Sequence, residues 1–400
     1  MQGQPQNPLE DQELTPYHEF LRARGQRFQQ ELTRIQQIAG SLTNYANLHL
    51  DLGLHLHTKD GAEPYWLWRE YLPGAKTVWL TTERLHFQRH AKFRFTPKDG
   101  DIFELRIPYA DLCHGLYVEL RIEPKNYEVL NADGIPTTLK RVPAFATWVE
   151  QNREIPTLWC ARIFHPQSPY QFTAPRPTPP QFLRIYEAHV GMAQPDTKHQ
   201  GESVGTYADF SHEILPRIKA CGYTSVQLMA IPEHPLYRSF GYQVSSYFAP
   251  CSRFGSPDDL KELIDHAHTL GLQIILDITH AHSCSNTEQG LSNYDGTSYF
   301  FSAQTNQWGT PTFDFNLEMT RKFLLSNLRY WLEEYRVDGF RFDAVERIVL
   351  LMAADHDKQD QQGNSHEGER SGRPDRADHI PQVCWHIGCT GRSDVPQHAT

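Results

Sequence analysis

The second half of this 400-residue chain alternates between short apolar runs and amphipathic stretches, and this alternation restricts the possible folds strongly. The runs and the helical patterns follow one another in this order: 182–190, 211–221, 224–231, 256–271, 272–278, 318–335 and 339–345. Strands of a parallel sheet are covered by helices on both faces, so they have this nearly continuous apolar texture. The sequence therefore predicts an α/β fold, either a (β/α) barrel or a doubly wound sheet.

The stretch at 256–271 has the most complete helix signals. Ser256 stands where an N-cap is expected, Pro257 takes the first helical position, and two aspartates follow in the first turn. Gly271 ends the apolar periodicity, as a glycine commonly does just beyond a helix. We therefore expect a helix between the strands at 224–231 and 272–278.

A different pattern precedes residue 166. Short alternating segments at 65–71, 77–80, 103–107 and 117–122 are separated by Pro-Gly, Asp-Gly and His-Gly pairs. Such spacing predicts a small antiparallel β-sandwich. The domains that we predict are a helical segment at 1–40, a β-sandwich at 41–165, a Pro-rich linker at 166–181, an α/β region at 182–350 and a polar, disordered tail at 351–400.

Composition excludes several classes of function. The net charge is −10 and the chain has no basic patch of the kind that a nucleic-acid binder needs. It also has no apolar run long enough to cross a membrane and no secretory signal at its N-terminus. The seven cysteines are odd in number and scattered, which favours reduced thiols. We therefore expect a cytoplasmic protein with neither nucleic acid nor a membrane as its partner.

Arg341 and Asp343 lie two apart in the last apolar run, so on a strand both side chains point to the same side. A guanidinium beside a carboxylate keeps that carboxylate ionised and fixes its orientation. A carboxylate that attacks the anomeric carbon of a sugar needs both properties. From spacing alone, a structural ion pair at a strand end is the somewhat more common explanation.

Polar side chains also follow two earlier runs, at the strand ends where a parallel barrel builds its active site. Asp277 lies near the end of one run, and His280 and His282 follow it. Tyr242 comes after the run at 224–231 and offers an aromatic face. The histidines are equally explained as loop residues, since two histidines two apart are weak evidence for a metal. Tyr242 is equally explained as a packing aromatic.

Together these stretches carry a close resemblance. Residues 183–345 resemble the branching enzymes of the alpha-amylase superfamily, especially the eukaryotic glycogen and starch branching enzymes. The stretches that match are IYEAHVGM at 185–192, FGYQVSSYFAPCSRFGSPDDLK at 240–261, DITHAHSCSN at 277–286 and LLSNLRYWLEEYRVDGFRFDAV at 324–345. Each is short, but their order and spacing are specific.

The resemblance implies a role for each candidate residue. Asp343 matches the nucleophile that forms the covalent glycosyl-enzyme, and Arg341 matches the arginine that holds this nucleophile ionised. Asp277 and His282 match residues around the sugar at the point of cleavage, and Tyr242 matches the aromatic platform under that sugar. The resemblance implies no metal and no organic cofactor.

The resemblance also implies a fold and a substrate. It implies an immunoglobulin-like sandwich, similar to a carbohydrate-binding module, followed by a (β/α)8 barrel of the TIM type. Only the first four strands of that barrel would be present, in 182–350. The implied substrate is an α-1,4-glucan such as glycogen, amylose or starch. The implied reaction cleaves this glucan and rejoins it through an α-1,6 bond in a retaining double displacement.

The resemblance stops after the fourth strand. The acid/base glutamate of the family belongs at the end of a fifth strand, and residues 346–400 contain no matching segment. We therefore expect that this glutamate is not present in this chain, that the chain is C-terminally truncated and that it is inactive as written. The alternatives are a hydrolase of the alpha-amylase superfamily and a non-catalytic or vestigial glucan-binding fragment.

Overall fold

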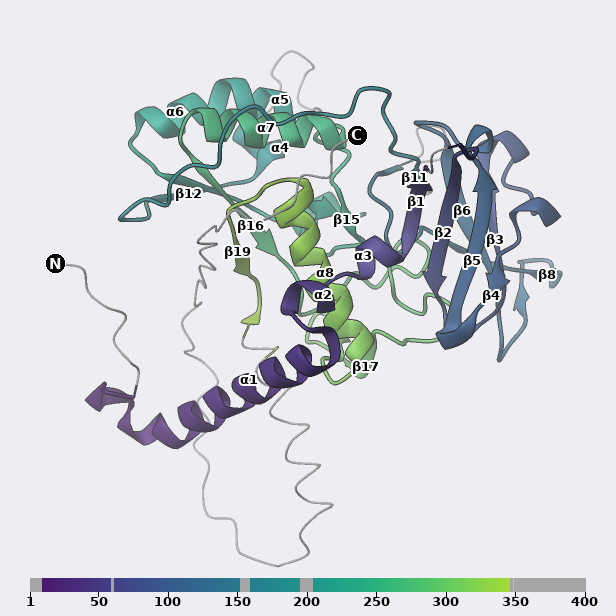
Figure 1. Cartoon of the computed structure of the whole chain (residues 1–400), viewed down its shortest axis with the longest axis horizontal. Coiled ribbons are helices and arrows are strands. Elements are labelled where there is room, and N and C mark those ends of the chain that lie inside the picture. Colours follow the sequence, from purple (N-terminus) through teal and green to yellow (C-terminus); the bar gives the residue numbers. More distant parts are fainter. Residues whose placement is uncertain (1–8, 59–60, 152–158, 195–203, 346–347, 349–400) are drawn as a thin grey trace, which may run out of the picture.

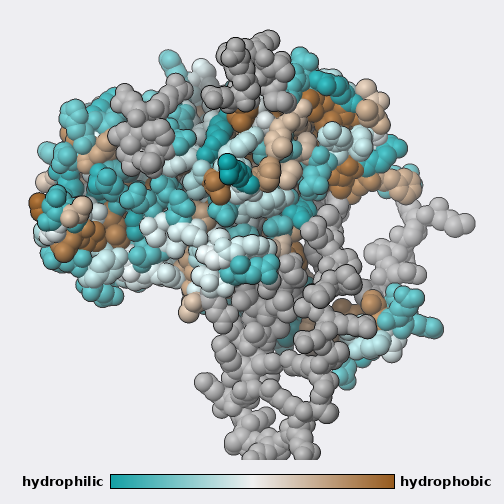
Figure 2. Space-filling model, turned by 180° about the vertical axis from the view of Figure 1, so that it is seen from behind, coloured by the Kyte–Doolittle hydropathy of each residue, from teal (hydrophilic) through white to brown (hydrophobic). Residues whose placement is uncertain are grey.

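The computed structural model describes residues 9–58, 61–151, 159–194, 204–345 and 348, and Figure 1 shows how their helices and strands are arranged. The predicted disordered tail at 351–400 lies outside the described residues. Among the described helices, none has both the length and the apolar character that a membrane span requires. The face shown in Figure 2 is mostly hydrophilic, with apolar side chains in small separate groups.

The N-terminal segment is helical, as the sequence predicts. Its elements are η1 Gln12–Tyr17, α1 His18–Ala39, α2 Leu42–Tyr45 and α3 Leu48–Asp51. The long helix α1 ends at Gly40, which has a left-handed φ of 75° and donates its backbone N–H to the carbonyl of Gln36. Most of α1 is exposed and Ile35 is its buried residue, so its C-terminal end is the part fixed to the rest of the protein.

Two antiparallel sheets follow, and Figure 1 shows them together at one end of the molecule. The first has the order β1 Gly53–His57, β2 Tyr65–Tyr71, β5 Ile102–Pro108 and β4 Thr96–Pro97. The second has the order β10 Val149–Gln151, β11 Trp159–Arg162, β6 Tyr117–Pro124 and β3 Ala75–Thr82, with β9 Leu139–Arg141 also paired to β6. A small hairpin joins β7 Val129–Leu130 to β8 Pro136–Thr137, and short 3-10 helices lie at η2 Glu83–Leu85, η3 Ala91–Phe93, η4 Asp99–Asp101 and η5 Tyr109–Asp111. The four predicted strands in this region are confirmed.

The connector at 166–181, all of which the structure describes, contains no helix or strand. It is nevertheless fixed in place by one carboxylate. Asp265 accepts hydrogen bonds from the hydroxyl of Tyr170 at 3.0 Å, from the backbone N–H of Thr173 at 2.9 Å and from that of Ala174 at 2.8 Å. The connector therefore lies against the helix Pro257–Thr269, which carries Asp265.

Four parallel strands form the sheet that the apolar runs predict. The order is β12 Ile185–Ala188, β13 Ser225–Leu228, β16 Gln273–Ile278 and β19 Gly339–Phe342. The helices after the strands are α4 Val190–Ala193, α5 Tyr207–Asp209, η7 Phe210–Ile214, α6 Leu215–Ala220, α7 Pro257–Thr269 and α8 Glu318–Glu334. Figure 1 shows α6 and α7 along one side of this sheet. The strands are shorter than their apolar runs: β12 and β13 begin after and end before their runs, while β16 omits only the first residue of its run and β19 omits the last three.

The helix predicted at 211–221 begins earlier in the structure than the sequence pattern indicates. The helical segment starts at Tyr207, where Thr206 and Asp209 form a reciprocal capping box. A π-helical stretch precedes Pro216, which stands at the start of α6. Proline has no N–H to continue an α-helical ladder, so the local change of hydrogen-bond pattern is expected there.

Two hairpins were not predicted. One joins β14 Pro232–Glu233 to β15 Ser246–Pro250 across the short helix η8 Tyr237–Ser239, and the other joins β17 Phe301–Thr305 to β18 Pro311–Phe313. Every residue of β15 is buried, so it has no alternation by which a strand could be recognised. Both hairpins lie in the loops that follow parallel strands, where they shape the region around the candidate site.

The antiparallel sheets and the parallel sheet share one continuous core. The ring of Phe145 lies 5.0 Å from that of Phe248 and 5.4 Å from that of Phe323, measured between centroids. Arg141, which is buried, donates hydrogen bonds across the same junction to the carbonyls of Tyr294 at 2.7 Å and Asn293 at 2.9 Å. The two halves are therefore joined by both apolar packing and buried polar contacts.

We expect Arg141→Ala to lower the free energy of unfolding by about 3 kcal/mol, because it leaves buried carbonyl groups without donors and opens a gap at the junction. Urea unfolding of the 400-residue chain measures this change. The exposed Arg84→Ala is the matched control and should change the free energy by less than about 0.5 kcal/mol. Equal effects of the two substitutions would contradict a junction held by Arg141.

Glu70, in β2, is a buried carboxyl group in the first sheet. Its side chain is 1% exposed and accepts a hydrogen bond from the indole N–H of Trp68 at 2.8 Å. Burial raises the pKa of Glu70 to about 8, while the bond from Trp68 opposes this shift. The folded state therefore retains a proton that the unfolded chain releases near pH 4.5.

Because folding raises this pKa, the stabilising contribution of Glu70 is complete below pH 4.5 and is lost as the pH rises toward 8. Glu70→Gln keeps an acceptor for Trp68 and cannot ionise. We expect it to match the unsubstituted chain near pH 4.5 and to be more stable by about 4 kcal/mol at pH 8. Urea unfolding at the two pH values, with exposed Glu63→Gln as the control, measures this difference. A difference that does not grow with pH would show that Glu70 is ionised in the fold.

Candidate functional site

The pairing of β16 with β19 brings three charged side chains together. Asp277 and Arg341 are directly opposite in the register of these parallel strands. The Nη1 atom of Arg341 lies 2.9 Å and 3.0 Å from the two carboxylate oxygens of Asp277 and 2.8 Å from Oδ1 of Asp343. One guanidinium nitrogen thus bridges two carboxylates, and the Arg341–Asp343 pair predicted from spacing is present.

Tyr242 and His282 extend this cluster. The hydroxyl of Tyr242 donates to Oδ2 of Asp277 at 2.9 Å. His282 approaches from the loop after β16, and its Nε2 lies 2.9 Å from the carbonyl oxygen of Tyr242. The five residues selected from the sequence therefore form one connected hydrogen-bonded group at the C-terminal ends of the parallel strands.

The three charged side chains differ in how far they reach solvent. The side chain of Asp277 is 0% exposed, that of Arg341 is 11% exposed and that of Asp343 is 21% exposed. Asp277 already accepts from both Arg341 and Tyr242, so its oxygens are committed to holding the cluster together. Asp343 is therefore the carboxylate that a substrate can reach.

Burial controls the protonation of the groups around Asp343. It raises the pKa of Asp277 to about 6, and the hydrogen bonds from Arg341 and Tyr242 oppose that rise. Burial also lowers the pKa of His282, so the imidazole is neutral near pH 7. With Nε2–H directed at the Tyr242 carbonyl, Nδ1 of His282 is an acceptor that has no hydrogen-bond partner among the described residues. Nδ1 is itself buried from solvent.

The turn that presents Tyr242 depends on a glycine. Gly241 has a φ of 91°, in the left-handed region. A Cβ atom at this position would lie 2.2 Å from the carbonyl oxygen of Ala230. The FGYQ stretch therefore needs glycine for both its backbone conformation and its close approach to the chain after β13.

Trp308 lies beside the cluster and was missed in the sequence. It belongs to the hairpin of β17 and β18, its side chain is 54% exposed, and its ring centroid lies 5.6 Å from that of His282. His282 also forms an isolated bridge with Thr312 of the same hairpin. The signal that the sequence offered was a single tryptophan in a polar stretch, because an aromatic face is suited to packing against a sugar ring.

His280 takes a structural place rather than a functional one. Its Nε2 lies 2.9 Å from Oδ1 of Asn327 on α8, and the Nδ2 atom of Asn327 donates in turn to the carbonyl of Tyr247 at 2.7 Å. Burial lowers the pKa of His280 to about 4. His280 thus connects the end of β16 to α8, and it does not pair with His282 around a metal.

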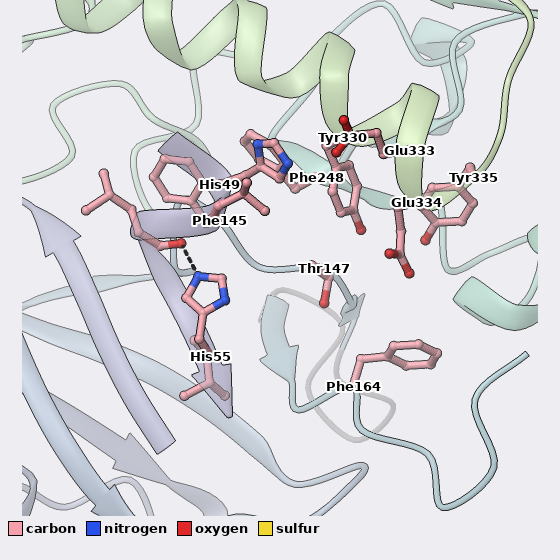
Figure 3. Close-up of a pocket in the computed structure, with 13 residues that line it drawn as sticks. His49, His55, Phe145, Thr147, Phe164, Phe248, Tyr330, Glu333, Glu334 and Tyr335 are labelled. Atoms are coloured by element: carbon pink, nitrogen blue, oxygen red, sulfur yellow. Dashed lines mark hydrogen bonds between the residues drawn. The ribbon is translucent and has the colours of Figure 1, made fainter. Parts of the chain in front are cut away.

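A cavity of about 350 Å³ lies away from this cluster, at the junction of the two halves. Figure 3 shows its lining, which includes His49, His55, several aromatic rings and the carboxylates of Glu333 and Glu334 near the end of α8. Burial lowers the pKa of His49 to about 4, so this ring is neutral. None of the five candidate residues lines this cavity, which separates it from the group around Asp343.

Comparison with known proteins shows which enzymes the chain resembles. Residues 198–295 match the alpha amylase catalytic domain. A 1,4-alpha-glucan-branching enzyme of Yarrowia lipolytica is 36% identical over 344 residues, which are 80% of this chain and 47% of that protein. One of Equus caballus is 36% identical over 352 residues, which are 85% of this chain and 47% of that protein.

The chain is a relative of the 1,4-alpha-glucan-branching enzymes. The resemblance predicted from the sequence is confirmed, and the matching stretches extend across both halves of the described structure. The chain spans about half the length of the branching enzymes that it matches.

A crystal structure assigned as an alpha amylase from Salmonella typhimurium has a similar fold. It matches with a TM-score of 0.56 and 22% identity, over 74% of this chain and 44% of that one. At this identity the match concerns the fold alone. Together with the alpha amylase family match, it indicates a (β/α)8-type fold.

Proposed function

We propose that this chain carries the donor-side half of a 1,4-alpha-glucan-branching active site, in which Asp343 is the nucleophile. The observation that supports this most is the difference in exposure within the cluster: Asp343 is accessible, while Asp277 is buried and held by Arg341 and Tyr242. The substrate would be an α-1,4-glucan such as glycogen, amylose or starch.

The geometry supports the first step of a retaining mechanism. An oxygen of Asp343 attacks C1 of the donor sugar, an ester bond forms, and the C1–O4 bond breaks. Arg341 holds Oδ1 of Asp343 at 2.8 Å, so the carboxylate is oriented before the substrate arrives. Tyr242 and His282 lie beside this position, where their rings would border the sugar.

The proton for the leaving oxygen O4 has to come from a second carboxyl group, about 5–5.5 Å from the nucleophile in retaining enzymes. Asp277 is unsuited to this role because its oxygens are buried against Arg341 and Tyr242. In the second step the same group would accept the proton of an acceptor 6-hydroxyl, whose oxygen attacks C1 and forms the α-1,6 bond while the ester bond between C1 and Asp343 breaks and the carboxylate is released. The steps need no metal and no organic cofactor.

We also propose the domain division given by the sequence. Residues 41–165 would be an immunoglobulin-like, carbohydrate-binding-module-like sandwich, and 182–350 would be the first half of the (β/α)8 barrel. The two antiparallel sheets and the four parallel strands support this division. We place the protein in the cytoplasm, because its scattered and odd-numbered cysteines favour reduced thiols.

The test uses a fusion protein in which residues 1–345 are followed by the part of the Yarrowia lipolytica relative that comes after its match to this chain. Incubation with amylose, followed by debranching, counts new α-1,6 linkages, and a parallel assay counts reducing ends. We expect α-1,6 linkages from the fusion protein and none from the 400-residue chain alone. Reducing ends without α-1,6 linkages would favour a hydrolase, and glucan binding without either product would favour a non-catalytic protein.

A further inference from the structure

A group of metal-ligating side chains lies outside the candidate active site, where η7 packs against α7. Glu262 and His266 are four residues apart on α7, so both project from the same face of the helix. His212, on η7, faces them, and its ring centroid lies 5.7 Å from that of His266. One nitrogen of each ring and one carboxylate oxygen of Glu262 lie within 4.8 Å of one another.

Ser211 orients this group from behind. Its hydroxyl is 2.9 Å from Nδ1 of His266 and 3.4 Å from Oε1 of Glu262, and the side chain of Ser211 is fully buried. Metal-binding histidines are commonly held in this way, by a hydrogen bond to the ring nitrogen that does not bind the metal. When the hydroxyl of Ser211 accepts a hydrogen bond from Nδ1–H of His266, the free lone pair of this imidazole is on Nε2. Nε2 is then the nitrogen that can bind a metal.

The distance between these side chains suits a shared metal ion better than a direct hydrogen bond between them. Nε2 of His212 lies 3.9 Å from Oε1 of Glu262, which is too far for a hydrogen bond. Two metal–ligand bonds of about 2.0–2.2 Å each span a gap of this size. The side chain of His212 is 64% exposed, so it can make the small adjustment that coordination requires and it is open to ions from solution.

The other cluster of this kind in the described part of the chain is unsuited to a cation. Glu233, His234 and Cys251 are fully buried, but the guanidinium of Arg253 occupies their neighbourhood. Its Nη1 lies 3.4 Å from Glu233, 2.7 Å from the carbonyl of His234 and 3.9 Å from Sγ of Cys251. A positive charge is therefore already present there, and it would repel a second one.

We propose that His212, Glu262 and His266 bind a divalent transition-metal ion. Two imidazoles and one carboxylate favour Zn²⁺ among the common ions, with water completing the coordination. The ion would link η7 to α7, two segments that are 50 residues apart in the sequence. The reaction proposed above needs no metal, so the role of this ion is to stabilise the helical layer.

The test is a Zn²⁺ titration of the 400-residue chain after EDTA treatment, followed by calorimetry. We expect His212→Gln and His266→Ala each to remove one bound Zn²⁺ per chain, and Ser211→Ala to weaken that site by about 10-fold. Zn²⁺ should also raise the melting temperature of the unsubstituted chain, and the two ligand variants should lose that increase.

His90→Ala is the matched control, because His90 is exposed and lies outside the cluster. It should retain the full Zn²⁺ stoichiometry and the rise in melting temperature. His212→Gln changes an exposed side chain, so a cooperative melt without Zn²⁺ will show that this variant is folded. Unchanged Zn²⁺ stoichiometry and affinity in both His212→Gln and His266→Ala would overturn the proposal.

Discussion

Asp343→Asn is expected to lower the branching rate of the fusion protein by about 10⁴-fold or more, the scale seen when a nucleophile is removed from a catalytic group that acts as a unit. Asparagine keeps the size of the side chain and an oxygen for Arg341, so the loss would come from the missing nucleophile. Counting α-1,6 linkages formed on amylose measures the rate.

The control for this substitution is Asp99→Asn, which removes an exposed carboxylate in η4 and should leave the rate unchanged. Unfolding of the Asp343→Asn protein should be as cooperative as that of the unsubstituted one, because Asp343 lies at the edge of the buried cluster. A residual rate above about one tenth would exclude Asp343 as the nucleophile.

Arg341→Ala is expected to affect stability as well as activity. Removing this guanidinium leaves the carboxylate of Asp277 buried with Tyr242 as its remaining described partner. Breaking a buried ion pair by removing one member costs about 3–5 kcal/mol, because the other charge stays uncompensated. Urea unfolding of the 400-residue chain at pH 7 should show a loss of that size.

A second substitution separates this effect from a general loss of packing. In the double variant Arg341→Ala, Asp277→Asn, no charge is left buried, so about half or more of the lost free energy should return. Exposed Arg238→Ala should cost less than about 0.5 kcal/mol. A double variant that is less stable than Arg341→Ala would show that Asp277 is not stabilised chiefly by its ion pair with Arg341.

The parallel strands and the grouping of the site residues could be predicted because both depend on local patterns. Continuous apolar runs marked β12, β13, β16 and β19. The side chains at the ends of parallel strands meet at one edge, so Asp277 and Asp343 were expected to be neighbours. The register that places Asp277 opposite Arg341 depends on how two distant strands pair, so it could not be predicted from a local pattern.

Contacts between distant segments could not be predicted. Arg141 meets carbonyls 152 and 153 residues further along the chain, and Asp295 accepts from the backbone N–H of Gly74 across the same junction. The carboxylate of Asp295 is buried at this junction. The place of Trp308 beside His282 likewise depends on how the hairpin of β17 and β18 folds back.

Covalent trapping in the fusion protein would show directly which residue attacks the sugar. A maltosyl fluoride that carries a second fluorine at C5 of the reacting ring slows both steps, while its fluoride leaves without help from an acid. We expect a single glycosyl adduct, located by mass spectrometry on the peptide that contains Asp343 and absent from Asp343→Asn. An adduct on another carboxylate, or no adduct from a fusion protein that still branches amylose, would contradict the assignment of Asp343 as the nucleophile.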